Sequence, residues 1–99
     1  MDALVVGAGA MGRWLGGCLV EATDWRVAFA DRDPGVAASA AAELDVARTA
    51  ALEGEERFDL VCIAVPISAT EAAIAEHAPR AERAILDVSG VMVGPVRAM

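Results

Sequence analysis

The chain has 99 residues, a formal net charge of −7 and a hydrophobic content of 57%, much of it alanine. An acidic chain without lysine argues against a nucleic-acid partner, because a phosphate backbone selects faces rich in basic residues. No apolar run approaches the roughly 18 residues of a membrane span, and the N-terminus lacks the basic and apolar regions of a signal peptide. We therefore expect a cytoplasmic protein with no membrane partner.

Short apolar runs alternate with alanine-rich segments along the chain, which is typical of βαβ units. The pattern predicts strands at residues 3–6, 25–30, 46–48, 59–65 and 84–88, helices at 11–22, 34–44 and 68–77, and a weak helix or loop at 49–57. Another helix is expected after Pro95. With right-handed connections, these elements form a doubly wound parallel sheet of the Rossmann type, in the order 3-2-1-4-5, with residues 1–99 as one domain.

The glycine-rich run Gly7-Ala8-Gly9-Ala10-Met11-Gly12 follows a buried type of strand and opens a helix. In this context the first glycine permits a tight turn, the second leaves room for a pyrophosphate, and the third lets the helix approach the strand. The N–H groups at the start of the helix can then receive phosphates. We predict a dinucleotide site that includes Gly7, Gly9, Ala10, Met11 and Gly12.

An acidic residue stands at the end of the second strand, where dinucleotide-binding domains hold the adenosine ribose. Asp31 lies 19 residues after Gly12. Its carboxylate can accept hydrogen bonds from ribose hydroxyls and repels a 2′-phosphate, which favours NAD over NADP. The neighbouring Arg32 can pair with that phosphate or stack on adenine, so NADP remains open. A solvated turn ahead of the helix cap Asp33 is the structural alternative for Asp31.

Val65 and Pro66 end the fourth strand, where ligands of open α/β sheets bind at the switch point between strands one and four. A cofactor contact and simple strand termination are equally compatible with Pro66. Ser68 is predicted to cap the next helix, with Glu71 as its capping-box partner, rather than to act as a nucleophile. His77 is expected to interact with the last carbonyls of that helix.

The two cysteines lie far apart in sequence, and the chain has a single histidine. We expect Cys18 and Cys62 to be reduced, buried side chains rather than a disulfide. A metal site needs closer clustering of ligands, so no metal is expected. No catalytic residue is identified from the residues alone.

Several segments together resemble the N-terminal cofactor domain of prephenate dehydrogenases, particularly the archaeal type. They are residues 7–14, 31–33, 65–71 and 86–91, with Pro95 and the closing Arg97-Ala98-Met99. The resemblance implies an oxidoreductase of tyrosine biosynthesis that decarboxylates prephenate oxidatively and passes a hydride to NAD or NADP. It also implies a helical, dimerising domain that completes the site for the small-molecule substrate. The catalytic histidine that the resemblance implies is likewise expected outside this chain.

The sequence departs from that family near its fifth strand, where a serine followed two residues later by a lysine is usual. Gly90 and Met92 stand at those positions, and Ser89 is one residue early. Two alternatives therefore stay open: a non-catalytic NAD-binding module, and another dehydrogenase of the β-hydroxyacid or F420-linked type.

Overall fold

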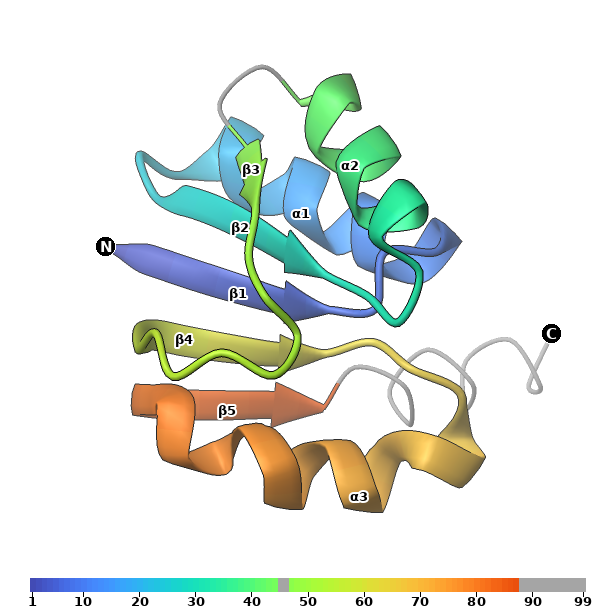
Figure 1. Ribbon diagram of the computed structural model, residues 1–99. Helices are drawn as coiled ribbons and strands as arrows, with labels where there is room; N and C mark the ends of the chain where they lie inside the picture. The colour runs from blue at the N-terminus through green and yellow to red at the C-terminus, as the bar shows by residue number, and fades with distance from the viewer. Residues whose placement is uncertain (45–46, 88–99) are drawn as a thin grey trace, which may run out of the picture.

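The computed structural model describes residues 1–44 and 47–87 (Figure 1). A parallel sheet has the order β3-β2-β1-β4-β5. Its strands are β1 (Asp2–Val6), β2 (Arg26–Ala30), β3 (Ala47–Thr49), β4 (Phe58–Ile63) and β5 (Ala81–Asp87). The helices are α1 (Ala10–Ala22), α2 (Pro34–Glu43) and α3 (Ile67–His77), followed by the short 3-10 helix η1 (Ala78–Arg80). The predicted doubly wound sheet and its strand order are confirmed.

Helices cover both faces of the sheet, with α1 and α2 on one face and α3 on the other (Figure 1). Successive side chains of a strand point to opposite faces. Leu4 and Val6 accordingly join the core beneath α3, whereas Val5 joins the core beneath α1 and α2. Both faces of β1 are therefore buried, which explains why the strand is a continuous apolar run rather than an alternating one.

Residues 50–57 join β3 to β4 without a helix, as one of the two predictions for this segment allowed. We call this segment the β3–β4 connection. It crosses the sheet on the side of α3, because Ala50 and Leu52 pack against the core of that face. The backbone N–H of Ala50 donates to the carbonyl of Phe29 at 2.9 Å, which anchors the start of the connection to β2.

Four local predictions were wrong. Strand β4 ends at Ile63, two residues before the predicted end at Val65. Helix α3 begins at Ile67 with Pro66 at its N-cap, so Ser68 lies inside the first turn and makes no capping bond. Strand β5 begins at Ala81 rather than at Ala84, because parallel pairing with β4 extends it through two exposed charged residues. Cys18 is exposed on α1, whereas Cys62 is buried as predicted.

Some predictions concern residues outside those that the structure describes. They are the start of the third strand at Val46, the end of the fifth strand at Val88, the helix after Pro95, and the positions of Gly90 and Met92.

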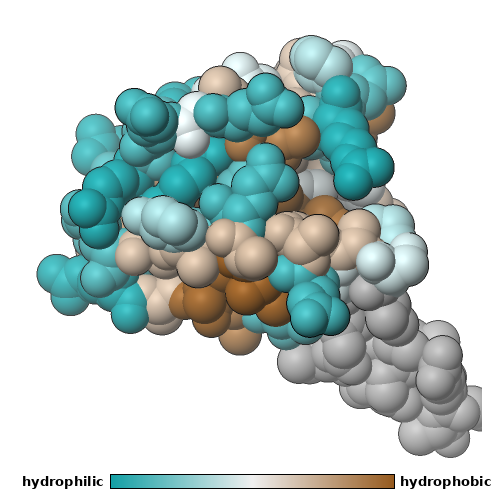
Figure 2. All heavy atoms as spheres, turned by 60° about the horizontal axis from the view of Figure 1, so that its bottom comes forward, coloured by the Kyte–Doolittle hydropathy of each residue, from teal (hydrophilic) through white to brown (hydrophobic). Residues whose placement is uncertain are grey.

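The molecular surface on the side of α3 is mixed in character. Figure 2 shows hydrophilic residues over most of the upper part of this view and a band of hydrophobic residues across its lower half. Several alanines of α3 and η1 are exposed, among them Ala72, Ala75 and Ala78. Within residues 1–44 and 47–87, no helix has the length and hydropathy that crossing a bilayer requires.

Candidate functional site

The glycine turn between β1 and α1 is shaped by two close backbone approaches. Gly7 has φ +99°, a conformation that side chains strongly disfavour, and a Cβ there would lie 2.3 Å from the carbonyl oxygen of Ala64. A Cβ on Gly12 would lie 1.8 Å from the carbonyl oxygen of Gly7. These two glycines are therefore required by the path of the backbone, as the sequence predicted for a tight turn and a close helix–strand approach.

Gly9 differs from these two glycines, because a Cβ added to it would meet nothing within 4 Å. The path of the backbone does not require a glycine here. A glycine does, however, leave the space in front of the backbone open. Gly9 is also the N-cap of α1, which has no side-chain cap and no acidic residue in its first turn. The first N–H groups of a helix carry partial positive charge, so this end of α1 suits an anion.

Asp31 connects the end of β2 to the glycine turn. One carboxylate oxygen accepts a hydrogen bond from the backbone N–H of Ala8 at 2.8 Å, and the other accepts from that of Asp33 at 2.9 Å. A carboxylate offers about four lone-pair positions, so acceptor capacity remains for a ligand. The solvated-turn alternative is thus partly right, since Asp31 does order the residues ahead of α2.

Arg13 braces the same turn from the helix side. Its Nε donates to the carbonyl of Ala8 at 2.9 Å, and its Nη1 pairs with Glu43 of α2 at 2.8 Å. Ala8 is therefore fixed at its N–H by Asp31 and at its carbonyl by Arg13. The sequence pattern did not single out either contact; Asp31 lies 23 residues from Ala8, and Arg13 lies five residues from it.

A cavity of about 430 Å³ opens at the carboxyl ends of β1, β2 and β4. Six of the predicted site residues line it: Gly7, Gly9, Asp31, Arg32, Val65 and Pro66. The structure thus brings together segments from three separate strand ends. Three predicted residues do not line the cavity: Ala10, which is exposed, Met11, and Gly12, which is buried behind the turn.

Helix α3 forms the opposite wall of this cavity, which sequence reasoning missed. The lining residues are Ser68, Ala69, Ala72, Ala73, Glu76 and His77, and Leu52 of the β3–β4 connection joins them. Their spacing of three and four residues is that of one helix face, so helical periodicity could have identified this stripe. Nothing in the local sequence marks Leu52.

His77 is buried, with 1% of its surface exposed, at the far end of this wall. Burial lowers the pKa of His77 below its ordinary value of 6.5; Glu76 opposes this shift and Arg80 adds to it. Its Nδ1 lies 3.5 Å from Nη1 of Arg80. Because Arg80 is a cation, the neutral imidazole is favoured. His77 is therefore a packed core residue beside the cavity, and the predicted contact of its side chain with the last helical carbonyls is not among the hydrogen bonds of the described residues.

Backbone N–H groups, the carboxylates of Asp31 and Glu76, and apolar walls line this cavity, which suits binding of a ligand. Within the described part of the chain, no three His, Cys, Asp or Glu residues gather as a metal site would require. Burial also raises the pKa of the Cys62 thiol to about 11, so this side chain is inert core rather than a nucleophile.

Comparison with known proteins places this geometry in context. Residues 18–99 match the family described as prephenate dehydrogenase, nucleotide-binding domain. The glycine turn itself precedes the matched range. No curated protein sequence matches the chain.

Several solved structures share the fold. A protein assigned as a myo-inositol dehydrogenase from Sinorhizobium meliloti is 26% identical with a TM-score of 0.73, covering 88% of this chain and 27% of its own. A shikimate 5-dehydrogenase from Thermus thermophilus, solved with shikimate, is 28% identical with a TM-score of 0.68. The match covers 87% of this chain and 32% of the shikimate dehydrogenase. RhlG from Pseudomonas aeruginosa, solved with NADP, is 20% identical with a TM-score of 0.59. The match covers 80% of this chain and 45% of RhlG, and at this identity it supports a shared fold only. The chain spans less than half the length of each of these structures.

Proposed function

Because the chain belongs to the family of prephenate dehydrogenase nucleotide-binding domains, we propose that its cavity binds NAD in preference to NADP. The single observation that carries the proposal is the convergence of three strand ends on one cavity. Gly9, Asp31 and Pro66 line that cavity together, although they are far apart in the sequence.

The pyrophosphate is proposed to lie over the backbone of the glycine turn, held by Gly7, Gly9, Ala10, Met11 and Gly12. Support comes from the open space in front of Gly9 and from the uncapped N-terminus of α1. Gly7 and Gly12 act indirectly, because their missing side chains allow the backbone to take this path. The N–H groups of Ala10 and Met11 begin the helix and would face the phosphates.

The preference for NAD rests on Asp31, which lines the cavity and is held in place by two backbone N–H groups. Its remaining lone pairs suit the ribose hydroxyls of adenosine, whereas its negative charge would repel a 2′-phosphate. Arg32 is exposed at the same edge and is proposed to contact adenine. Val65 and Pro66 are proposed to line the cofactor from the β4 side.

For the whole protein, we propose a cytoplasmic prephenate-dehydrogenase-like oxidoreductase of tyrosine biosynthesis, in which bound NAD accepts a hydride. The substrate site is proposed to be completed by a helical, dimerising domain. A non-catalytic NAD-binding module is the second candidate, favoured by Gly90 and Met92 in place of the family's serine and lysine. Oxidation of prephenate by the full-length protein with NAD separates the two.

Titration calorimetry with NAD tests the binding site. Gly9→Val fills open space without touching the fold, so it should keep native stability and lose detectable NAD binding. Gly17→Ala is the matched control, because it also enters open space on α1 but is not a cavity residue. Equal NAD affinity in wild type and Gly9→Val would refute the proposed site.

A further inference from the structure

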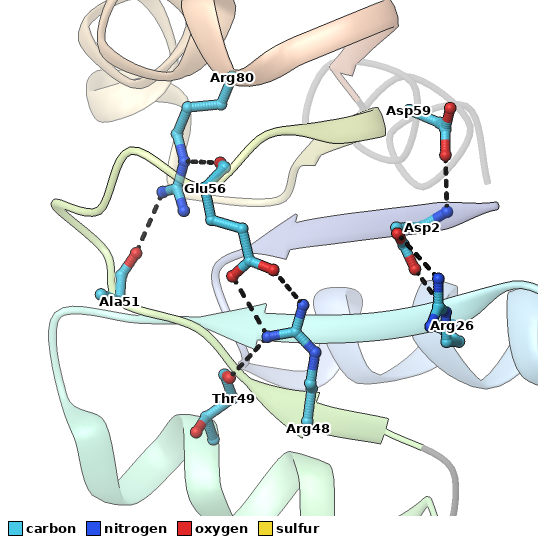
Figure 3. Close-up of polar contacts among 8 residues, drawn as sticks. All are labelled: Asp2, Arg26, Arg48, Thr49, Ala51, Glu56, Asp59 and Arg80. Atoms are coloured by element: carbon cyan, nitrogen blue, oxygen red, sulfur yellow. Dashed lines mark hydrogen bonds and ion pairs between the residues drawn. The ribbon is translucent and has the colours of Figure 1, made fainter.

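Arg80 is a buried cation outside the glycine turn, with 5% of its surface exposed. Its Nε donates to the carbonyl of Glu56 at 3.0 Å, and its Nη1 donates to those of Ala51 at 3.1 Å and Leu52 at 3.2 Å. Figure 3 shows the guanidinium reaching from η1 to the β3–β4 connection. One side chain therefore holds three carbonyls of a segment that has no helix of its own.

A buried guanidinium is costly unless its donors are paired. Nε and Nη1 of Arg80 are paired, but its buried Nη2 has no hydrogen-bond partner among the described residues, so its position calls for a physical reason. Arg80 also stacks on the ring of Phe58, with its Cζ 5.6 Å from the ring centroid. The planar fork reaches several acceptors at once, which a lysine ammonium cannot do in the same geometry. The arrangement is thus specific for arginine, and its effect is to fix where the backbone of residues 51, 52 and 56 runs.

The fixed backbone determines where Leu52 lies. Its carbonyl is held by Arg80, while its side chain packs on the core beneath α3, and the residue lines the cavity together with Gly9 and Asp31. Leu52 also lines an adjoining groove with Asp31 and Arg32. It therefore stands on the side of the cavity where the proposed function places the adenosine half of the cofactor.

We propose that Arg80 is a positioning residue for dinucleotide binding, which holds Leu52 as the apolar wall beside the adenosine half. This inference rests on the proposed function, because the occupant of the cavity is taken from it. Arg80 makes its contribution through the β3–β4 connection and through Leu52.

The test measures dissociation constants for NAD and for ADP-ribose, which lacks nicotinamide, at a temperature where circular dichroism shows each variant to be folded. Arg80→Lys and Leu52→Ala should each weaken the binding of both ligands by about fivefold or more. In either variant the bound ligand lacks an apolar contact that the wild type holds in place. The loss should be equal for the two ligands, since Leu52 lies away from the nicotinamide end. The double variant should bind no more weakly than the worse single variant, because both changes remove the same contact.

Arg48→Gln provides the matched control. Arg48 is exposed, pairs with Glu56 of the same connection and stacks on the same Phe58 ring at 5.7 Å, but does not bond the carbonyls of Ala51 and Leu52 (Figure 3). The affinities of Arg48→Gln for NAD and ADP-ribose should stay within about twofold of those of the wild type, because an exposed ion pair contributes little free energy.

The outcomes distinguish this inference from the proposed function. A wild type that binds neither ligand overturns the proposed function and this inference with it. Native affinity in folded Arg80→Lys, or additive losses in the double variant, overturns the inference alone. If Arg80→Lys does not fold, Leu52→Ala still decides: unchanged affinity for ADP-ribose would mean that Leu52 is not a binding wall.

Discussion

The Asp31 carboxylate accepts a 2.8 Å hydrogen bond from the backbone N–H of Ala8, which joins the end of β2 to the glycine turn. This one contact couples the proposed ribose acceptor to the proposed phosphate cradle. The relative position of the two parts is thereby set before any cofactor binds, and binding does not have to order them.

Removing the charge of Asp31 should change the choice of cofactor. In Asp31→Asn, a side-chain oxygen remains for one backbone N–H, but the repulsion of a 2′-phosphate is lost. We expect NAD to bind about tenfold more weakly, as for loss of a charged hydrogen bond, and NADP to bind no more weakly than before. Calorimetric affinities for both cofactors check this. Because the ratio is compared, general loosening of the turn cannot produce the result; a larger loss for NADP would assign the choice to Arg32.

Adding a methyl group at Gly12 should destabilise the fold, whereas the same change at Gly17 should not. The Cβ of Gly12→Ala would overlap the carbonyl of Gly7, and we expect a loss of about 3 kcal/mol, as for overpacked cores. Gly17→Ala enters open space in the same helix and should stabilise by about 0.5–1 kcal/mol through helix propensity. Urea denaturation measures both. Effects of the same sign would contradict the close approach of α1 to β1.

The stability of the protein should fall as the pH drops below neutrality because of His77. Its pKa is lowered in the fold, so the unfolded chain takes up a proton near pH 6.5 that the native chain refuses until a lower pH. Stability is therefore full above pH 6.5 and declines as the pH falls through that value toward the native pKa.

His77→Gln is the control for this slope, since the chain has one histidine. Chemical denaturation between about pH 7.5 and pH 5.5 should show a decline in wild type and a nearly flat profile in the variant. Asp59 acts in a separate range: the backbone N–H of Asp2, with help from Arg83, lowers its pKa below 3.8, so its contribution is lost only in stronger acid. A sloping profile in His77→Gln would mean that another group is responsible.

The two thiols should differ strongly in reactivity. Cys18 is exposed on α1, whereas Cys62 is buried in β4 and its pKa is raised to about 11. Iodoacetamide at pH 8 should therefore add one label to the native chain and a second only after unfolding. Mass spectrometry reads the count, and Cys18→Ser should give no label in the native state. Rapid labelling of Cys62 in that variant would contradict its burial.

The sequence by itself determined the architecture. Alternating apolar runs and helical segments depend on local periodicity, and the handedness of βαβ connections then leaves few arrangements, so the order 3-2-1-4-5 follows without coordinates. The glycine turn could equally be predicted from the sequence, because the steric constraints that require Gly7 and Gly12 belong to a short, recognisable motif. Local rules were weaker at element ends: Ser68, two residues after Pro66, suggested a helix cap, but the helix starts one residue before Ser68.

Only the tertiary structure decided which residues share the cavity and which hydrogen bonds support it. Asp31 and Ala8, or Arg80 and Leu52, are far apart along the chain, and no local pattern records such pairs. Leu52 in particular lies in a segment without periodicity, and its place beside Asp31 depends on a buried arginine that follows α3. Side chains that meet through folding are selected by packing and hydrogen-bond geometry in three dimensions, so their partnership appears only when the sheet is assembled.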